Sequence, residues 1–202
     1  MDNQWIYALA GIGIAAIALL TFLVMYQPVV PSRPNDLHFH ADFKVFIHHQ
    51  ALDFSQSRFQ SDENQSLSPS IHLHGGDGNV IHKHQSRVTL GDFFESIGMK
   101  LSSTCILLID KTTYCNSGEN TLKMFVNGKP SNEFDRYDFQ DLDRILISYG
   151  NDSSDVIANQ LSQVTDNACI QSGTCPERGA PFDESDCTTA NGCMATGPMV
   201  IE

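Results

Sequence analysis

Apolar and polar side chains alternate along residues 37–47. A period of two residues is typical of a strand that buries one face. The apolar positions are Leu37, Phe39, Ala41, Phe43, Val45 and Ile47, and the opposite face carries His38, His40, Asp42, Lys44 and His48. We therefore expect a half-buried strand that turns back at His49 and Gln50 into residues 51–54.

A second hairpin and a helix follow a polar surface loop at residues 55–70. Residues 71–74 and 80–84 flank a glycine-rich centre, which supplies the positive φ that a tight connection needs. Residues 89–98 predict one short helix that Gly98 can end. Its apolar stripe has the i, i+3, i+4, i+7 spacing of a helix face and consists of Leu90, Phe93, Phe94 and Ile97.

The remaining core elements are predicted to be strands. Residues 105–109 form a buried-type strand that returns at 114–115, and residues 122–126 run into an Asn-Gly turn. The last core strand is expected at 144–149. Beyond it, residues 154–161 begin a short amphipathic helix.

The first residues predict a membrane anchor. Residues 5–26 are 22 residues without a charge. At about 1.5 Å each, such a stretch can cross the roughly 30 Å hydrocarbon core. A signal peptide is the alternative, but its apolar region is usually shorter, and the sequence offers neither a basic start nor a small-residue cleavage site. We expect an uncleaved transmembrane anchor over 1–27 and a proline-rich spacer over 28–36.

The cysteines indicate the compartment. Six cysteines fall into local pairs, namely Cys105 with Cys115, Cys169 with Cys175, and Cys187 with Cys193. None forms a CxxC motif, which weakens zinc-knuckle and thioredoxin interpretations. An even number in local pairs favours structural disulfides, which persist outside the cytosol, although six reduced cysteines are the alternative. We expect a single-pass protein of the cell membrane whose C-terminal domain lies outside the cytoplasm.

The formal net charge of −12 argues against nucleic acid as a partner, because phosphates recruit Lys and Arg. Residues 151–202 hold 8 acidic side chains and 1 basic side chain, so most of this charge belongs to the C-terminal tail. That tail is poor in large apolar residues after residue 165, and we expect it to be tied by disulfides or partly disordered.

Two sets of motifs resemble known groups of proteins. The segments 88–98, 125–130 and 142–147, in that order, resemble the sulfur-carrier proteins of the β-grasp (ubiquitin-like) group, whose thiolated Gly-Gly end is absent here. Further motifs are His38-Phe39-His40-Ala41-Asp42-Phe43, His72-Leu73-His74, Gly78-Asn79-Val80-Ile81-His82 and Leu90-Gly91-Asp92-Phe93-Phe94. They resemble uncharacterised, membrane-anchored, His-rich proteins of small-genome bacteria and archaea.

The predicted fold class is α+β. It comprises the N-terminal transmembrane helix, a β-grasp-like extracytoplasmic domain over 37–150 with one short central helix, and residues 151–202 as a short helix and an acidic, cysteine-containing tail.

The histidines form the most informative pattern. Three His-x-His pairs occur within 47 residues, and they are His38 with His40, His72 with His74, and His82 with His84. Residues i and i+2 of a strand point to the same face, so each pair presents two imidazoles side by side. If His72 lies opposite His82 and the first strand lies beside this hairpin, six imidazoles can converge on one surface.

Such a density of imidazole is what Zn(II), Cu(II) and Ni(II) bind. We expect a copper or zinc ion held by three or four of the six histidines, with Asp42 and Asp77 as candidates to orient a ring N–H. The alternative is that these positions simply face solvent. His48 and His49 lie at a turn and are expected to be bystanders.

The sequence therefore favours a membrane-anchored, extracytoplasmic metal-binding protein whose protein partner stays open. A metal-dependent hydrolase or oxidoreductase with an open coordination position is a second hypothesis, although no HExxH-like base accompanies the histidines. A thiol–disulfide redox protein and a structural or adhesive domain are further alternatives.

Overall fold

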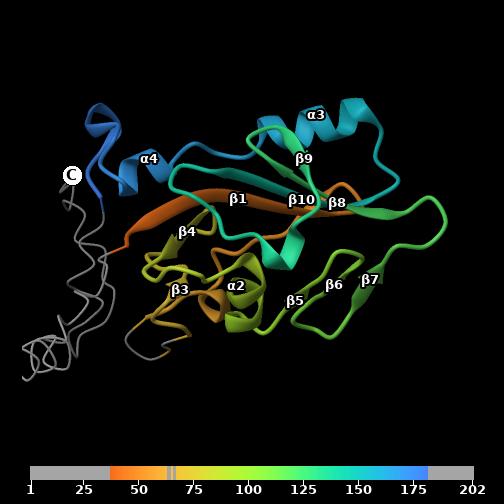
Figure 1. The fold of residues 1–202 in the computed structure, drawn as a ribbon, viewed down its shortest axis with the longest axis horizontal. Helices are drawn as coiled ribbons and strands as arrows, with labels where there is room; N and C mark the ends of the chain where they lie inside the picture. Colours follow the sequence, from red (N-terminus) through yellow and green to blue (C-terminus); the bar gives the residue numbers. More distant parts are fainter. Residues whose placement is uncertain (1–36, 63–64, 66, 182–202) are drawn as a thin grey trace, which may run out of the picture. The chain divides into compact units, whose positions relative to one another are not determined.

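The structure is a computed structural model that describes residues 37–62, 65 and 67–181. Its main sheet has seven strands, with the order β3-β4-β1-β10-β8-β9 and with β2 paired to β1 (Figure 1). The bounds of these strands are β1 (Phe39–Ile47), β2 (Gln50–Ala51), β3 (Ile71–His72), β4 (Val80–Lys83), β8 (Thr121–Val126), β9 (Lys129–Ser131) and β10 (Arg144–Gly150). A three-stranded sheet joins β5 (Lys100–Leu101), β6 (Cys105–Leu107) and β7 (Thr113–Cys115).

The centre of the main sheet is a parallel pair. β1 runs parallel to β10, with Asp42 opposite Arg144 and Ile47 opposite Tyr149. Every other pairing in this sheet is antiparallel, including β1 with β4 and β10 with β8. The first and last long strands of the described chain thus lie side by side, and both are buried along most of their length.

The helices are few and short. They are α2 (Leu90–Ser96), α3 (Ser154–Ser162), α4 (Ala168–Gln171) and the 3₁₀ turns η1 (Ser57–Phe59), η2 (Phe134–Arg136) and η3 (Pro176–Arg178). A capping box starts α2, in which the Thr89 hydroxyl accepts from the backbone N–H of Asp92 and the Asp92 carboxylate accepts from that of Thr89. Ser153 caps α3.

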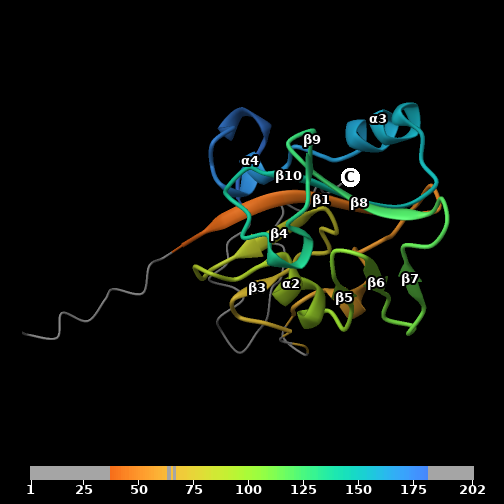
Figure 2. The same cartoon turned by 45° about the vertical axis from the view of Figure 1, so that its right-hand side comes forward.

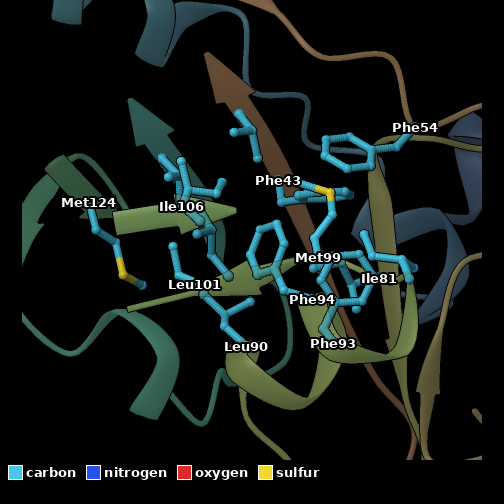
Figure 3. Close-up of a cluster of buried hydrophobic side chains, with 14 of the residues drawn as sticks. Phe43, Phe54, Ile81, Leu90, Phe93, Phe94, Met99, Leu101, Ile106 and Met124 are labelled. Atoms are coloured by element: carbon cyan, nitrogen blue, oxygen red, sulfur yellow. The ribbon is translucent and has the colours of Figure 1, made fainter. Parts of the chain in front are cut away.

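The main core lies on the face of the sheet that α2 covers. Phe93 and Phe94 of α2 are fully buried against Phe43 of β1 and the β5–β6 hairpin, as Figure 3 shows. On the opposite face a smaller cluster, consisting of Phe46, Leu146, Ile157 and Val164, packs α3 onto the sheet (Figure 2). Both faces of β1 and β10 are therefore covered, as is usual for parallel strands.

The predicted α+β fold class is wrong. The described residues are mostly β with few helices, because α2, α3 and α4 have only 7, 9 and 4 residues and short strands occupy much of the remaining chain. None of the helices in this part of the chain has the length and apolar character that a membrane crossing requires. The predicted anchor and spacer at 1–36 lie outside the described residues.

Several local predictions are nevertheless confirmed. The strand, hairpin and helix patterns appear at β1, β3–β4 and α2, with bounds shifted by at most two residues. The predicted pairs Cys105 with Cys115 and Cys169 with Cys175 are disulfides, whereas Cys187 and Cys193 lie outside the described residues. Gly75 and Gly76 adopt the positive φ expected between β3 and β4.

Because Phe93 is fully buried in the main core, we expect Phe93→Ala to destabilise the fold by about 3–5 kcal/mol through lost burial and a residual cavity. Glu95→Ala, at an exposed position of the same helix, should change stability by less than about 0.5 kcal/mol. Equilibrium denaturant unfolding measures both. Equal effects of the two substitutions would contradict this description of the core.

Candidate functional site

Strand register brings the histidines of three strands to one face. His40 of β1 lies opposite His82 of β4, and His82 lies opposite His72 of β3. This is the register predicted from the sequence, and it places Ile71 and Ile81 on the buried core face. We call the six side chains the histidine face, which consists of His38, His40, His72, His74, His82 and His84.

Within the histidine face, His74 and His82 are in direct contact. The Nε2 atom of His74 lies 3.2 Å from the Nδ1 atom of His82, and the two ring centroids are 4.0 Å apart. The centroid of His40 lies 4.8 Å from that of His82, and the centroid of His72 lies 5.5 Å from that of His74. These four rings, His40, His72, His74 and His82, are the inner four.

The two other rings form an outer row. The centroid of His84 lies 4.5 Å from that of His38 and 4.9 Å from that of His72. His38 is exposed and His84 is half-buried. The six imidazoles therefore converge in the fold. The sequence predicted this only if the first strand lay beside the hairpin.

The inner rings do not simply face solvent. His40, His74 and His82 retain only 3%, 2% and 1% of their accessible surface, although they lie on the polar face of their strands. The face is enclosed because the chain after α3 crosses back over β1, so that α4 packs on this strand (Figure 1). Burying a polar ring is costly unless its nitrogens find partners, so the surroundings of these rings define their chemistry.

His40 is held by a two-step hydrogen-bond chain. Its Nδ1 atom lies 2.8 Å from the hydroxyl of Ser172, and this hydroxyl lies 2.6 Å from Oδ1 of Asp141. An ionised carboxylate only accepts, so the single hydroxyl proton of Ser172 goes to Asp141, and Ser172 must accept from the Nδ1–H of His40. In the neutral ring this leaves the lone pair on Nε2.

His72 is oriented in the same sense by a different group. Its Nδ1 atom lies 2.8 Å from the carbonyl oxygen of Ser68, which can only accept a hydrogen bond. The neutral ring of His72 therefore also has its lone pair on Nε2. Histidine ligands of metals typically donate their second ring N–H to a carboxylate or a carbonyl in this way.

The loop that carries Asp141 is itself fixed by a buried carboxylate. Asp143 accepts from the Tyr137 hydroxyl at 2.6 Å, from the backbone N–H of Gln140 at 2.8 Å and from the Asn127 amide at 2.7 Å. Burial, together with this bond to Asp143, raises the pKa of the Tyr137 phenol far above its ordinary value. Tyr137 consequently remains a donor throughout the physiological pH range.

The predicted partners Asp42 and Asp77 serve other purposes. Asp42 is buried and accepts from the Thr165 hydroxyl and from the backbone N–H groups of Asn167 and Ala168 at 2.8 and 2.9 Å. Asp77 accepts from the backbone and side chain of Asn79 within its own turn. Asp42 thus anchors the start of α4 on β1, while the ring-orienting groups are Asp141, Ser172 and Ser68.

His48 and His49 lie beyond the other end of β1, where they form the turn to β2. The Nδ1 atom of His49 lies 3.0 Å from Oδ1 of Asp152. The structure therefore does not bring these two histidines to the histidine face.

The assigned tautomers can be measured directly. We expect ring nitrogen chemical shifts to show protonated Nδ1 and unprotonated Nε2 in the neutral rings of His40 and His72. Ser172→Ala should remove this preference at His40 and leave it intact at His72, which serves as the internal control. A neutral His40 ring protonated at Nε2 would contradict the proposed chain.

Within residues 37–62, 65 and 67–181, no group of three or more His, Cys, Asp or Glu side chains is arranged so that it could hold a metal ion. Comparison of the chain with protein-family models, with curated proteins and with solved structures finds no match. The function must therefore be argued from the histidine face itself.

Proposed function

We propose that this protein binds a zinc or copper ion through the His-x-His pairs at one end of β1, β3 and β4, with His74 and His82 as its first two ligands. The observation that carries the proposal is the distance of 3.2 Å between Nε2 of His74 and Nδ1 of His82. Two nitrogens bound at about 2.0–2.1 Å to one tetrahedral zinc ion lie about 3.3 Å apart. This contact is an N–H···N hydrogen bond, so one of the two nitrogens carries a proton. Once that proton leaves, the spacing is close to that of two ligands that share a metal.

The flanking rings supply further ligands. His40 and His72 lie next to the pair, and the acceptors at their Nδ1 atoms leave Nε2 as the coordinating nitrogen of each. Rotation of one or both rings about their side-chain torsions completes a set of three or four, which the observed arrangement does not yet form. His38 is exposed and His84 is half-buried, so in this proposal the outer rings give an incoming ion its first contact.

The type of ligand narrows the choice of metal. Neutral imidazole suits Zn(II), Cu(II) and Ni(II), whereas Mg(II) and Ca(II) prefer sets of oxygen ligands. Copper stands highest in the affinity order, and zinc best matches the tetrahedral spacing of the His74–His82 pair. The acidic chain also favours the approach of a cation, although charge alone gives no selectivity.

The disulfides support a location outside the cytosol. Cys105–Cys115 and Cys169–Cys175 are both bridged, and such bonds persist in oxidising compartments. Zinc and copper ions encountered there would be the ions that the protein binds, stores or passes on.

A metal titration tests the proposal. We expect the full chain, purified without a His-tag, to bind close to one equivalent of Zn(II) or Cu(II) in competition with a chromophoric chelator. His74→Ala and His82→Ala should each lower the affinity about a hundredfold or more, since each removes a direct ligand.

His48→Ala is the matched control, because His48 lies in the turn beyond the far end of β1 and should leave the affinity unchanged. A full chain that binds neither ion, or one that binds equally well after His74→Ala and His82→Ala, would overturn the proposal. Circular dichroism of each variant separates loss of a ligand from loss of the fold.

A further inference from the structure

The disulfide Cys169–Cys175 closes a short loop directly beside the histidine face. We call residues 169–175 the disulfide loop. Its chain returns on itself, because the carbonyl of Cys169 accepts from the backbone N–H groups of Thr174 and Cys175 at 2.9 and 3.3 Å. The loop is fixed to β1 at its start, where the buried carboxylate of Asp42 holds Asn167 and Ala168.

Ser172 is the contact between this loop and the inner four. Its hydroxyl is the atom that joins the ring of His40 to Asp141, and its backbone N–H donates to the carbonyl of Ala168 at 2.9 Å. The position of Ser172 is therefore set by the disulfide on one side and by the Asp42 anchor on the other. Opening the disulfide removes the covalent link and leaves the C-terminal half of the loop held by backbone hydrogen bonds, whereas the Asp42 anchor remains.

A cation lies at one sulfur of this bond. Nη1 of Arg178 lies 3.4 Å from Sγ of Cys169, and the same guanidinium pairs with the carboxylate of Asp166 at 2.9 Å. The hydrogen bond from Arg178 lowers the pKa of the Asp166 carboxyl. A guanidinium beside a sulfur stabilises the thiolate that forms when the bond is reduced, which makes a disulfide easier to reduce.

We propose that Cys169–Cys175 is a redox-sensitive bond that sets the metal affinity of the histidine face through Ser172. This inference rests on the proposed function, since it names the regulation of the same site. With the bond closed, Ser172 and Asp141 hold the Nδ1–H of His40 and keep Nε2 ready to coordinate. With the bond open, the loop that carries Ser172 loses its covalent link, the hold of Ser172 on His40 loosens, and the metal is held more weakly.

The proposed reductant is a dithiol, which opens the disulfide in two thiol–disulfide exchange steps. One thiolate of the dithiol attacks Sγ of Cys169, the less buried residue of the two, and Cys175 leaves as a thiolate and takes up a proton. The second thiolate of the dithiol then attacks the dithiol sulfur of this mixed disulfide. Cys169 leaves as a thiolate beside Arg178, and the dithiol is released as its own disulfide.

The size of the expected change in Zn(II) affinity follows from the role of Ser172 as a group that orients a metal ligand. Loss of such a group typically weakens metal binding about 10–100-fold. We therefore expect the variant with both Cys169→Ser and Cys175→Ser to bind Zn(II) at least about tenfold more weakly than the oxidised wild-type chain does. Serine is used because the variant then has no thiolate in the loop that could itself bind the metal.

A double-mutant comparison tests whether the effect passes through Ser172. Ser172→Ala should weaken Zn(II) binding by a similar factor in the wild-type chain, but should add little in the variant that lacks Cys169 and Cys175. The matched control carries Cys105→Ser and Cys115→Ser. It removes the disulfide between β6 and β7 of the other sheet, and it should bind Zn(II) as the wild-type chain does.

Unchanged Zn(II) affinity after loss of Cys169 and Cys175 overturns the inference, as does a weakening by Ser172→Ala that is equally large in both backgrounds. Wild-type chain that binds no Zn(II) or Cu(II) overturns the proposed function instead. The ring nitrogen shifts of His40 then still decide whether the bond controls its tautomer, since the preference for Nδ1–H should disappear when the disulfide is removed.

Discussion

The arrangement of this protein depends on the register between three neighbouring strands. With His40 opposite His82 and His82 opposite His72, every second residue of β1, β4 and β3 points to the same face. A shift of one residue would move the imidazoles into the core and the apolar side chains of Ile71 and Ile81 to the other face. The same constraint that builds the core under α2 therefore gathers the histidines.

The face of the sheet opposite α2 carries the histidines, and packing on this face explains why the inner rings are buried rather than exposed to solvent. Because β1 is a central strand paired with β10, its polar face is covered by the chain that follows α3. The buried Asp42 fixes this chain in place, and the segment it fixes brings Ser172 to His40. The covering of β1, the orientation of the His40 ring and the position of the disulfide loop thus follow from one packing arrangement.

The sequence predicted the local features of this site better than its architecture. Alternation over β1 and the His-x-His spacing were sufficient to predict which residues share a face, because both follow from the period of a strand. The fold class was wrong, since short strands such as β5 and β9 leave no clear pattern in the sequence. Asp141 and Ser172 were missed because they lie 101 and 132 residues from His40, and their contacts exist only in the folded chain. Asp42 was assigned to the wrong partner for the same reason, because nothing near it in sequence indicates that α4 returns to β1.

We propose that imidazole nitrogens of the histidine face bind a metal ion, and X-ray absorption spectroscopy of the Zn(II)-loaded full chain tests this proposal most directly. We predict a first shell of three or four light ligands dominated by imidazole nitrogen at about 2.0–2.1 Å, with the multiple-scattering pattern of ordered rings. Zinc bound at about 2.3 Å by sulfur, or by oxygen ligands alone, would contradict it.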